Sequence, residues 1–315
     1  MGRCLVIRYH DIISIDNLLA AWKEFIPGKK KKRDVQVFSS RLLENILDLH
    51  SDLANRTYVH GKYQAFKIND PKPRDIHKAT VRDRLLHHAI YRILYPFFAS
   101  KFIADSFSCQ LGKGTHRALD RFRAFAYQAS KNHTKMCWIL KCDIRKFFAS
   151  IDHQILKRIV MLHTQDNETE WLLDRVIDSH NPGLPLGNLT SQLLVNIYMN
   201  EFYQFVKHQL KVQHYIRYAD DFVLFLHDRE KEGHLISEID QFLTTNLKLQ
   251  LHPDKCFIKT IASGVDFLGW VHFPDHRVLR TSTKRRMLKR VNETNKASYE
   301  GMLKHGNTLQ LLAKL

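Results

Sequence analysis

Residues 215–226, YIRYADDFVLFL, decide how the rest of this sequence is interpreted. Two runs rich in aromatic and β-branched residues flank a short turn, a pattern that predicts a β-hairpin with Asp220 and Asp221 at its tip. Adjacent carboxylates repel each other, so the pair favours a bound cation. Hard oxygen ligands select Mg²⁺, for which Mn²⁺ can substitute. A solvated turn is the alternative interpretation, because Asp is common in turns.

A third carboxylate, Asp143, ends the short apolar run 138–142, which predicts another strand. A polar turn follows and leads into a helix capped by Asp152. If the strand lies beside the hairpin, three carboxylates can hold two metal ions about 4 Å apart, which activate a 3′-hydroxyl and stabilise leaving pyrophosphate. The expected catalytic residues are therefore Asp143, Asp220 and Asp221.

The charge balance indicates a polyanionic partner. The 315 residues contain 49 Lys and Arg against 32 Asp and Glu, a net charge of +17. This excess favours phosphate backbones through counterion release, although ribosomal and membrane-surface proteins share it. No apolar run is long enough to span a bilayer and the start resembles no signal peptide, so we expect a cytoplasmic protein without membrane contact. The five scattered cysteines predict reduced, mostly buried thiols.

Hydrophobic spacing predicts the remaining elements. Helices are expected at 38–53, at 79–94 with a stop at Pro96, at 116–128 and at 190–210, and a short strand at 63–68. The basic run 29–33 reads as an exposed loop, and the prolines of 70–76 exclude a helix there. From Thr281 onward the chain is basic and helical.

Two motifs resemble the reverse transcriptase family. Residues 218–221, YADD, look like its YxDD box, and residues 143–153 look like its first acidic motif. The resemblance implies that the three aspartates bind the metals, with the Ile144 carbonyl as a further ligand. It also implies nucleotide binding by Lys146, Phe147 and Phe148. Phe148 matches a bulky steric gate that excludes a 2′-hydroxyl by shape, so that DNA is the product. Core packing is the preferred role for Phe147.

Further implied residues contact the substrate or the nucleic acid. Lys72 and Arg74 resemble a fingers motif that holds the triphosphate of a dNTP, with an ordinary exposed basic loop as the alternative. Contacts to template RNA or to the RNA/DNA hybrid are expected from several residues along the chain, namely Arg82, Lys113, Gln192, Tyr218, Lys284, Arg285 and Arg286. A solvated helix face is the alternative for the last three.

The turn 183–192 resembles one branch of the family. Leu186 and Gln192 stand where most reverse transcriptases have Gln and Pro, a departure typical of diversity-generating retroelements. This likeness implies error-prone copying of a template RNA, with a small basic oligomeric accessory protein as partner. Replacing a polar contact by Leu186 removes a check on base position, unless Leu186 is a plain packing residue. A defence-associated bacterial reverse transcriptase and a non-catalytic RNA-binding protein of the same fold are the alternatives.

The implied architecture is an α+β right-hand polymerase with helical fingers, an antiparallel-sheet palm and a short helical thumb. We expect an N-terminal extension at 1–33 and fingers at 34–135. The palm is expected at 136–280, with a return to the fingers at about 153–187, and the thumb starts within 281–315.

Overall fold

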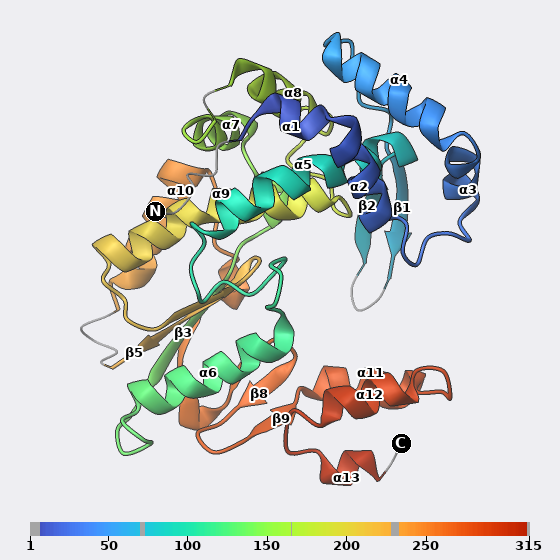
Figure 1. Cartoon of the computed structure of the whole chain (residues 1–315). Helices are drawn as coiled ribbons and strands as arrows, with labels where there is room; N and C mark the ends of the chain where they lie inside the picture. Colours follow the sequence, from blue (N-terminus) through green and yellow to red (C-terminus); the bar gives the residue numbers. More distant parts are fainter. Residues whose placement is uncertain (1–6, 70–72, 165, 228–232, 314–315) are drawn as a thin grey trace, which may run out of the picture. The chain divides into compact units, whose positions relative to one another are not determined.

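The computed structural model describes residues 7–69, 73–164, 166–227 and 233–313. The chain forms two compact units, each described here by itself (Figure 1). The helical unit contains residues 1–103, 146–203 and 243–249, and the sheet unit contains residues 104–145, 204–242 and 250–315. In the described ranges no helix is both long and apolar enough to cross a membrane. The four cysteines within them are free, as expected.

The helical unit surrounds helix α5, Val81–Ala99, against which α2, Ile15–Phe25, packs. Apolar residues at helical spacing on α2, such as Leu18 and Phe25, are fully buried in this contact. A hairpin of β1, Gln64–Ile68, and β2, Arg74–Lys78, projects a largely exposed pair of strands. The other elements are α1 Tyr9–Ile13, α3 Arg33–Ser40, α4 Leu42–Ala54, the 3₁₀ turn η1 Phe147–Ser150, α7 His153–Met161, α8 Asn167–Ile177 and α9 Leu189–Gln204.

Two expected helix boundaries in this unit are wrong. Helix α5 continues through Pro96 to Ala99, because a proline within the final turn removes a single backbone hydrogen bond and the same turn buries Phe98. The helix expected at 38–53 is divided at Arg41 into α3 and α4. There the Asn45 side chain donates to the Phe38 carbonyl (2.9 Å) and so caps the end of α3. The strand expected at 63–68 and the helix cap at Asp152 are confirmed.

The sheet unit is built on an antiparallel sheet with the strand order β4-β5-β3-β6. Helix α6, Thr115–Ala129, lies over one face of it, as Figure 1 shows. The remaining elements are β3 Trp138–Asp143, the π-helical turn η2 Phe205–Gln209, β4 Tyr215–Tyr218, β5 Asp221–Leu226, α10 Leu235–Leu247 (whose last turn belongs to the helical unit), η3 Pro253–Lys255, β6 Phe257–Thr260, η4 Ile261–Ser263, β7 Val265–Phe267, β8 Trp270–His272, β9 Arg277–Leu279, α11 Thr281–Arg290, α12 Lys296–Leu303 and α13 Leu309–Leu312.

Two cores stabilise the sheet unit. One lies between α6 and the main sheet and includes Phe122, Ile139 and Phe225. The other joins Leu119 of α6 to the small sheet β7-β8-β9 and to the C-terminal helices through Trp270. The helical character expected after Thr281 is confirmed, and these helices are anchored by their apolar side while their basic residues face outward.

Candidate active site

The register of the main sheet brings the predicted acids together. Asp143 at the end of β3 is paired directly with Asp221 at the start of β5. Tyr218 pairs with Asp221 across the hairpin, which leaves Ala219 and Asp220 as a two-residue turn. Ala219 has φ +55°, the left-handed conformation of a tight hairpin turn. The hairpin expected from the sequence and the neighbouring strand are therefore confirmed.

The acids lie at one end of a sheet face that packs against α6 through apolar residues and also carries Lys141. Alternate residues of a strand share a face, and opposite partners of a register pair lie on the same side. The pair Ile139 and Phe225 is buried beneath α6, and Asp143 and Asp221 lie four residues further along the same face. The buried apolar residues thus hold one end of β3 and β5 in place, and the carboxylates lie at the other end of this strand pair.

Two lysines that were not predicted balance the paired carboxylates. Lys141, 8% exposed, donates to Asp221 Oδ1 at 2.9 Å. Lys255, the last residue of η3, donates to Asp143 Oδ1 at the same distance. Because these contacts are partly shielded from solvent, each lysine offsets the desolvation of its carboxylate partner.

Asp220 forms no such ion pair among the described residues, and its pKa is raised to about 6. Burial is the main cause, and the negative charges of Asp143 and Asp221 act in the same direction. The backbone N–H of Ile144 donates to the Asp220 carbonyl oxygen at 3.2 Å, which ties the turn to β3. A nearby cation would favour the charged form of Asp220.

Arg217 supports the acidic turn from the interior of the sheet unit. It is 2% exposed, and its guanidinium donates to the Ala219 carbonyl (3.1 Å) and to Ser106 Oγ (2.9 Å). The segment around Ser106 runs beside β4, with the Phe107 N–H donating to the Arg217 carbonyl. Residues 105–107 thereby fix Arg217, and Arg217 fixes the turn.

The three carboxylates supply the hard oxygen donors that a divalent cation such as Mg²⁺ prefers. Within the described ranges, no three His, Cys, Asp or Glu side chains are arranged closely enough to hold a metal ion. Lys141 and Lys255 balance the charges of Asp221 and Asp143 in this arrangement.

The predicted gate lies on η1 of the helical unit. Phe147 is 3% exposed, which agrees with the packing role preferred for it, whereas Phe148 is half-buried. The Phe148 carbonyl accepts from the Leu184 N–H at 2.8 Å. Gly183 has φ +62°, and a Cβ there would lie 2.2 Å from the same carbonyl oxygen. The turn that begins at Gly183 therefore holds η1 tightly. Lys146, just before η1, is exposed.

The other predicted nucleotide contacts also belong to the helical unit, except that Lys72 lies outside the described residues. Arg74 is exposed at the start of β2. Leu186 and Gln192 are half-buried at the turn before α9 and in its first helical turn. The Leu186 carbonyl accepts from the His77 N–H of β2 at 3.0 Å, so this turn is bound to the base of the hairpin.

Several predicted nucleic-acid contacts have partners within the protein. Arg82 forms an ion pair with Asp52. Lys113 donates to the Ala104 carbonyl at 2.6 Å, and the Tyr218 hydroxyl lies 3.1 Å from Thr115 Oγ1. On α11, Lys284 and Arg285 are exposed and Arg286 is half-buried.

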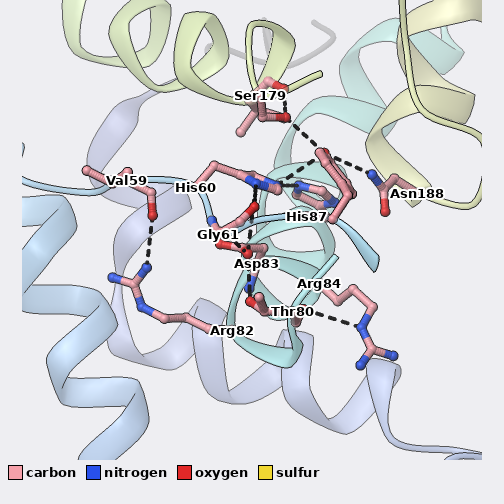
Figure 2. Close-up of polar contacts among 12 residues, drawn as sticks. Val59, His60, Gly61, Thr80, Arg82, Asp83, Arg84, His87, Ser179 and Asn188 are labelled. Atoms are coloured by element: carbon pink, nitrogen blue, oxygen red, sulfur yellow. Dashed lines mark hydrogen bonds and ion pairs between the residues drawn. The ribbon is translucent and has the colours of Figure 1, made fainter. Parts of the chain in front are cut away.

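A buried polar network links the segment before β1 to the start of α5 (Figure 2). The Asp83 carboxylate, 1% exposed, accepts from the Tyr58 hydroxyl (2.7 Å), the Thr80 hydroxyl (2.6 Å) and the Gly61 N–H (3.1 Å). Beside it, His60 Nε2 lies 3.2 Å from Nε2 of the fully buried His87.

The His87 imidazole predicts an acid-sensitive step in stability. Burial lowers its pKa to about 3, and the charges of His60, His88 and Arg84 lower it further. The charge of Asp83 acts in the opposite direction. Below about pH 6.5, His87 is protonated in the unfolded chain but stays neutral in the folded protein. The free energy of unfolding therefore falls as the pH is lowered, by up to about 3 kcal/mol at pH 4.5.

We expect His87→Phe to flatten this pH dependence by close to one proton. Urea unfolding of the wild type and the variant between pH 7 and pH 4.5 measures the two slopes. Identical slopes would show that His87 does not titrate in this way.

The three lysine and arginine supports of the acids were missed, although two of them left a signal. Lys141 and Arg217 are charged residues inside the apolar strand runs 138–142 and 215–218. A charge in a buried strand requires a partner, but the acid nearest to Lys141 along the chain is Asp143, whereas its partner is Asp221 of β5. Lys255 has no comparable local signal.

Comparison with solved structures identifies the type of fold. An apo telomerase of Candida tropicalis matches 68% of this chain and 47% of its own chain, with a TM-score of 0.52 and 11% identity. A form of it truncated from its C-terminal domain matches 74% of this chain and 59% of its own, with a TM-score of 0.54. The mixed α+β fold is therefore one that also occurs in a telomerase chain.

Sequence comparison then identifies the family. The model of the reverse transcriptase (RNA-dependent DNA polymerase) family matches residues 67–272, more than half of the chain. This chain belongs to that family and carries an RNA-dependent DNA polymerase domain, for which the family implies the right-hand fold.

Two curated relatives agree with this assignment. Protein YkfC of Escherichia coli is 25% identical over the matched region, which covers 77% of this chain and 74% of YkfC. The group II intron-encoded protein LtrA of Lactococcus lactis is 24% identical over the matched region, which covers 82% of this chain and 54% of LtrA. The chain thus spans about half the length of LtrA and of the telomerase.

Proposed function

We propose that this chain copies an RNA template into DNA, and that Asp143, Asp220 and Asp221 hold two Mg²⁺ ions for the nucleotidyl transfer. The observation that carries the proposal is the direct pairing of Asp143 with Asp221 beside the Asp220 turn. Two ions at this place would activate the primer 3′-hydroxyl and stabilise the leaving pyrophosphate. The pKa of Asp220 supports the proposal, because a buried acid among like charges gains from a cation.

The unpredicted basic residues have distinct roles in this scheme. Lys141 and Lys255 balance the charge of two of the acids and hold their carboxylates in place. Arg217 holds the Ala219 carbonyl, so the turn that presents Asp220 does not rearrange under the charge repulsion of the three acids.

The test is primer extension with the purified chain. We expect incorporation of dNTPs on a defined RNA template in the presence of Mg²⁺ or Mn²⁺, and none with a chelator. The absence of synthesis with either ion, on templates that the chain binds, would contradict the proposal.

The finer proposal is that this polymerase is the error-prone enzyme of a diversity-generating retroelement, working with a small basic oligomeric accessory protein. It is supported by Leu186 in the turn before α9, where an apolar side chain replaces a polar contact, and by Gln192 in the first turn of that helix. A template repeat and an accessory gene beside the coding sequence would separate this role from a defence role.

Leu186→Gln is expected to reduce misincorporation opposite template adenine by about fivefold or more, because the amide restores a polar check on base position. Sequencing of cDNA made on a defined RNA measures the error spectrum. Leu162→Gln is the matched control, since Leu162 is 74% exposed in the same unit. An unchanged error spectrum for Leu186→Gln would show that Leu186 serves only in packing.

A further inference from the structure

One side chain, Tyr63, joins three separate segments of the helical unit. Its hydroxyl lies 2.8 Å from Ser179 Oγ, which follows α8, and 3.1 Å from Nδ2 of Asn188, which precedes α9. His60 Nε2 is a third neighbour at 3.3 Å. Figure 2 shows Ser179, His60 and Asn188 around this point. Because Tyr63 directly precedes β1, its contacts tie the base of the hairpin to both helices.

The partners determine the direction of these hydrogen bonds. Ser179 donates its own hydrogen to the Val176 carbonyl at 2.6 Å, so Ser179 Oγ accepts from the Tyr63 hydroxyl. The Asn188 amide donates to the Tyr63 oxygen. Asn188 is 2% exposed, so loss of this acceptor would leave its amide N–H buried without that partner. The chain of donors runs from Asn188 through Tyr63 to Ser179.

Two hydrogen bonds join the turn of Leu186 to the hairpin and to Tyr63. Its carbonyl accepts from the His77 N–H, and two residues later Asn188 binds Tyr63. Between them Gly187 has φ +113°, and a Cβ there would lie 3.0 Å from Ile76 Cγ2. The turn therefore packs closely against the hairpin at Gly187, and the two hydrogen bonds on either side of Gly187 set its position.

We infer that Tyr63 and Asn188 are a positioning pair that sets where Leu186 stands relative to the β1–β2 hairpin, and thereby the base discrimination of the enzyme. The part about discrimination rests on the proposed polymerase function. Tyr63 and Asn188 act through the turn and need not touch the nucleotide.

The variant Tyr63→Phe keeps the ring and removes the hydroxyl. We expect the KM for dNTPs and the misincorporation frequency to rise by about 2- to 10-fold, the range for one lost buried hydrogen bond, with a smaller change in kcat. Asn188→Ala should act in the same direction. The double variant should be no worse than the more affected single one, because both remove the same contact.

Tyr58→Phe is the matched control. It also removes one buried hydroxyl from this network, at Asp83, but not from the Leu186 turn. It should lower the melting temperature and leave KM and the error spectrum unchanged. Equal effects of Tyr58→Phe and Tyr63→Phe on the error spectrum would overturn the inference.

Hydrogen exchange separates this inference from the proposed function. In Tyr63→Phe the His77 amide, which donates to the Leu186 carbonyl, should exchange faster by about 3-fold or more. In Tyr58→Phe it should exchange faster only in proportion to the overall loss of stability. Unchanged exchange of the His77 amide in Tyr63→Phe would overturn the positioning role, whether or not the wild type makes cDNA. A wild type that makes no cDNA would refute only the polymerase proposal.

Discussion

Asp221→Asn, alone or combined with Asp220→Asn, is expected to lower Mg²⁺-dependent dNTP incorporation on an RNA template by about 1000-fold or more. Asn has nearly the same shape as Asp, and its carbonyl oxygen can still accept from Lys141, so the fold should persist. The variant loses the negative charge that a divalent cation requires. Binding to RNA should remain close to that of the wild type, because phosphate contacts depend on basic residues.

Asp275→Asn is the control for this prediction, since Asp275 is an exposed carboxylate of the same unit. Its activity should match the wild type. Primer extension measures incorporation, and filter binding with labelled RNA measures affinity. Synthesis by Asp220→Asn/Asp221→Asn at more than about a tenth of the wild-type rate would refute the assignment of the metal site.

The acidic hairpin could be predicted because its determinants are local. The residues that form β4 and β5, the turn between them and the acids at the tip are contiguous in 215–226, and the period-two pattern sets which side chains are buried. Asp143 required one long-range assumption, that β3 lies beside the hairpin, and the apolar character of 138–142 made that pairing favourable.

The counter-charges could not be predicted in the same way. Lys255 reaches Asp143 because β3 pairs with β6, and the register of that pairing is not contained in either segment alone. The ion pair of Arg82 with Asp52 depends on how α4 packs, which sequence spacing does not reveal. The contacts of Tyr63 with Ser179 and Asn188 likewise join residues more than a hundred positions apart.

Phe148→Ala is expected to raise the use of ribonucleotides relative to deoxyribonucleotides by about 10- to 100-fold. Phe148 follows Asp143 by five residues along the chain, and its ring is half-buried, so part of it remains available to a substrate. A ring beneath the incoming sugar excludes the 2′-hydroxyl by shape, and the methyl group of Ala leaves room for it. Competition between each dNTP and its rNTP in primer extension measures the ratio.

Phe147→Ala supplies the contrast, because Phe147 is adjacent in sequence, in contact with the ring of Phe148 and almost fully buried. That truncation should cost about 3 to 5 kcal/mol of stability and leave the sugar preference of the folded fraction unchanged. Phe148→Ala should show the opposite pattern, a small loss of stability with a large change in sugar selection, since η1 is held by the Leu184 N–H and by the close approach of Gly183 rather than by the Phe148 ring. If ribonucleotide use does not rise, the gate assignment is wrong and the ring serves only to pack.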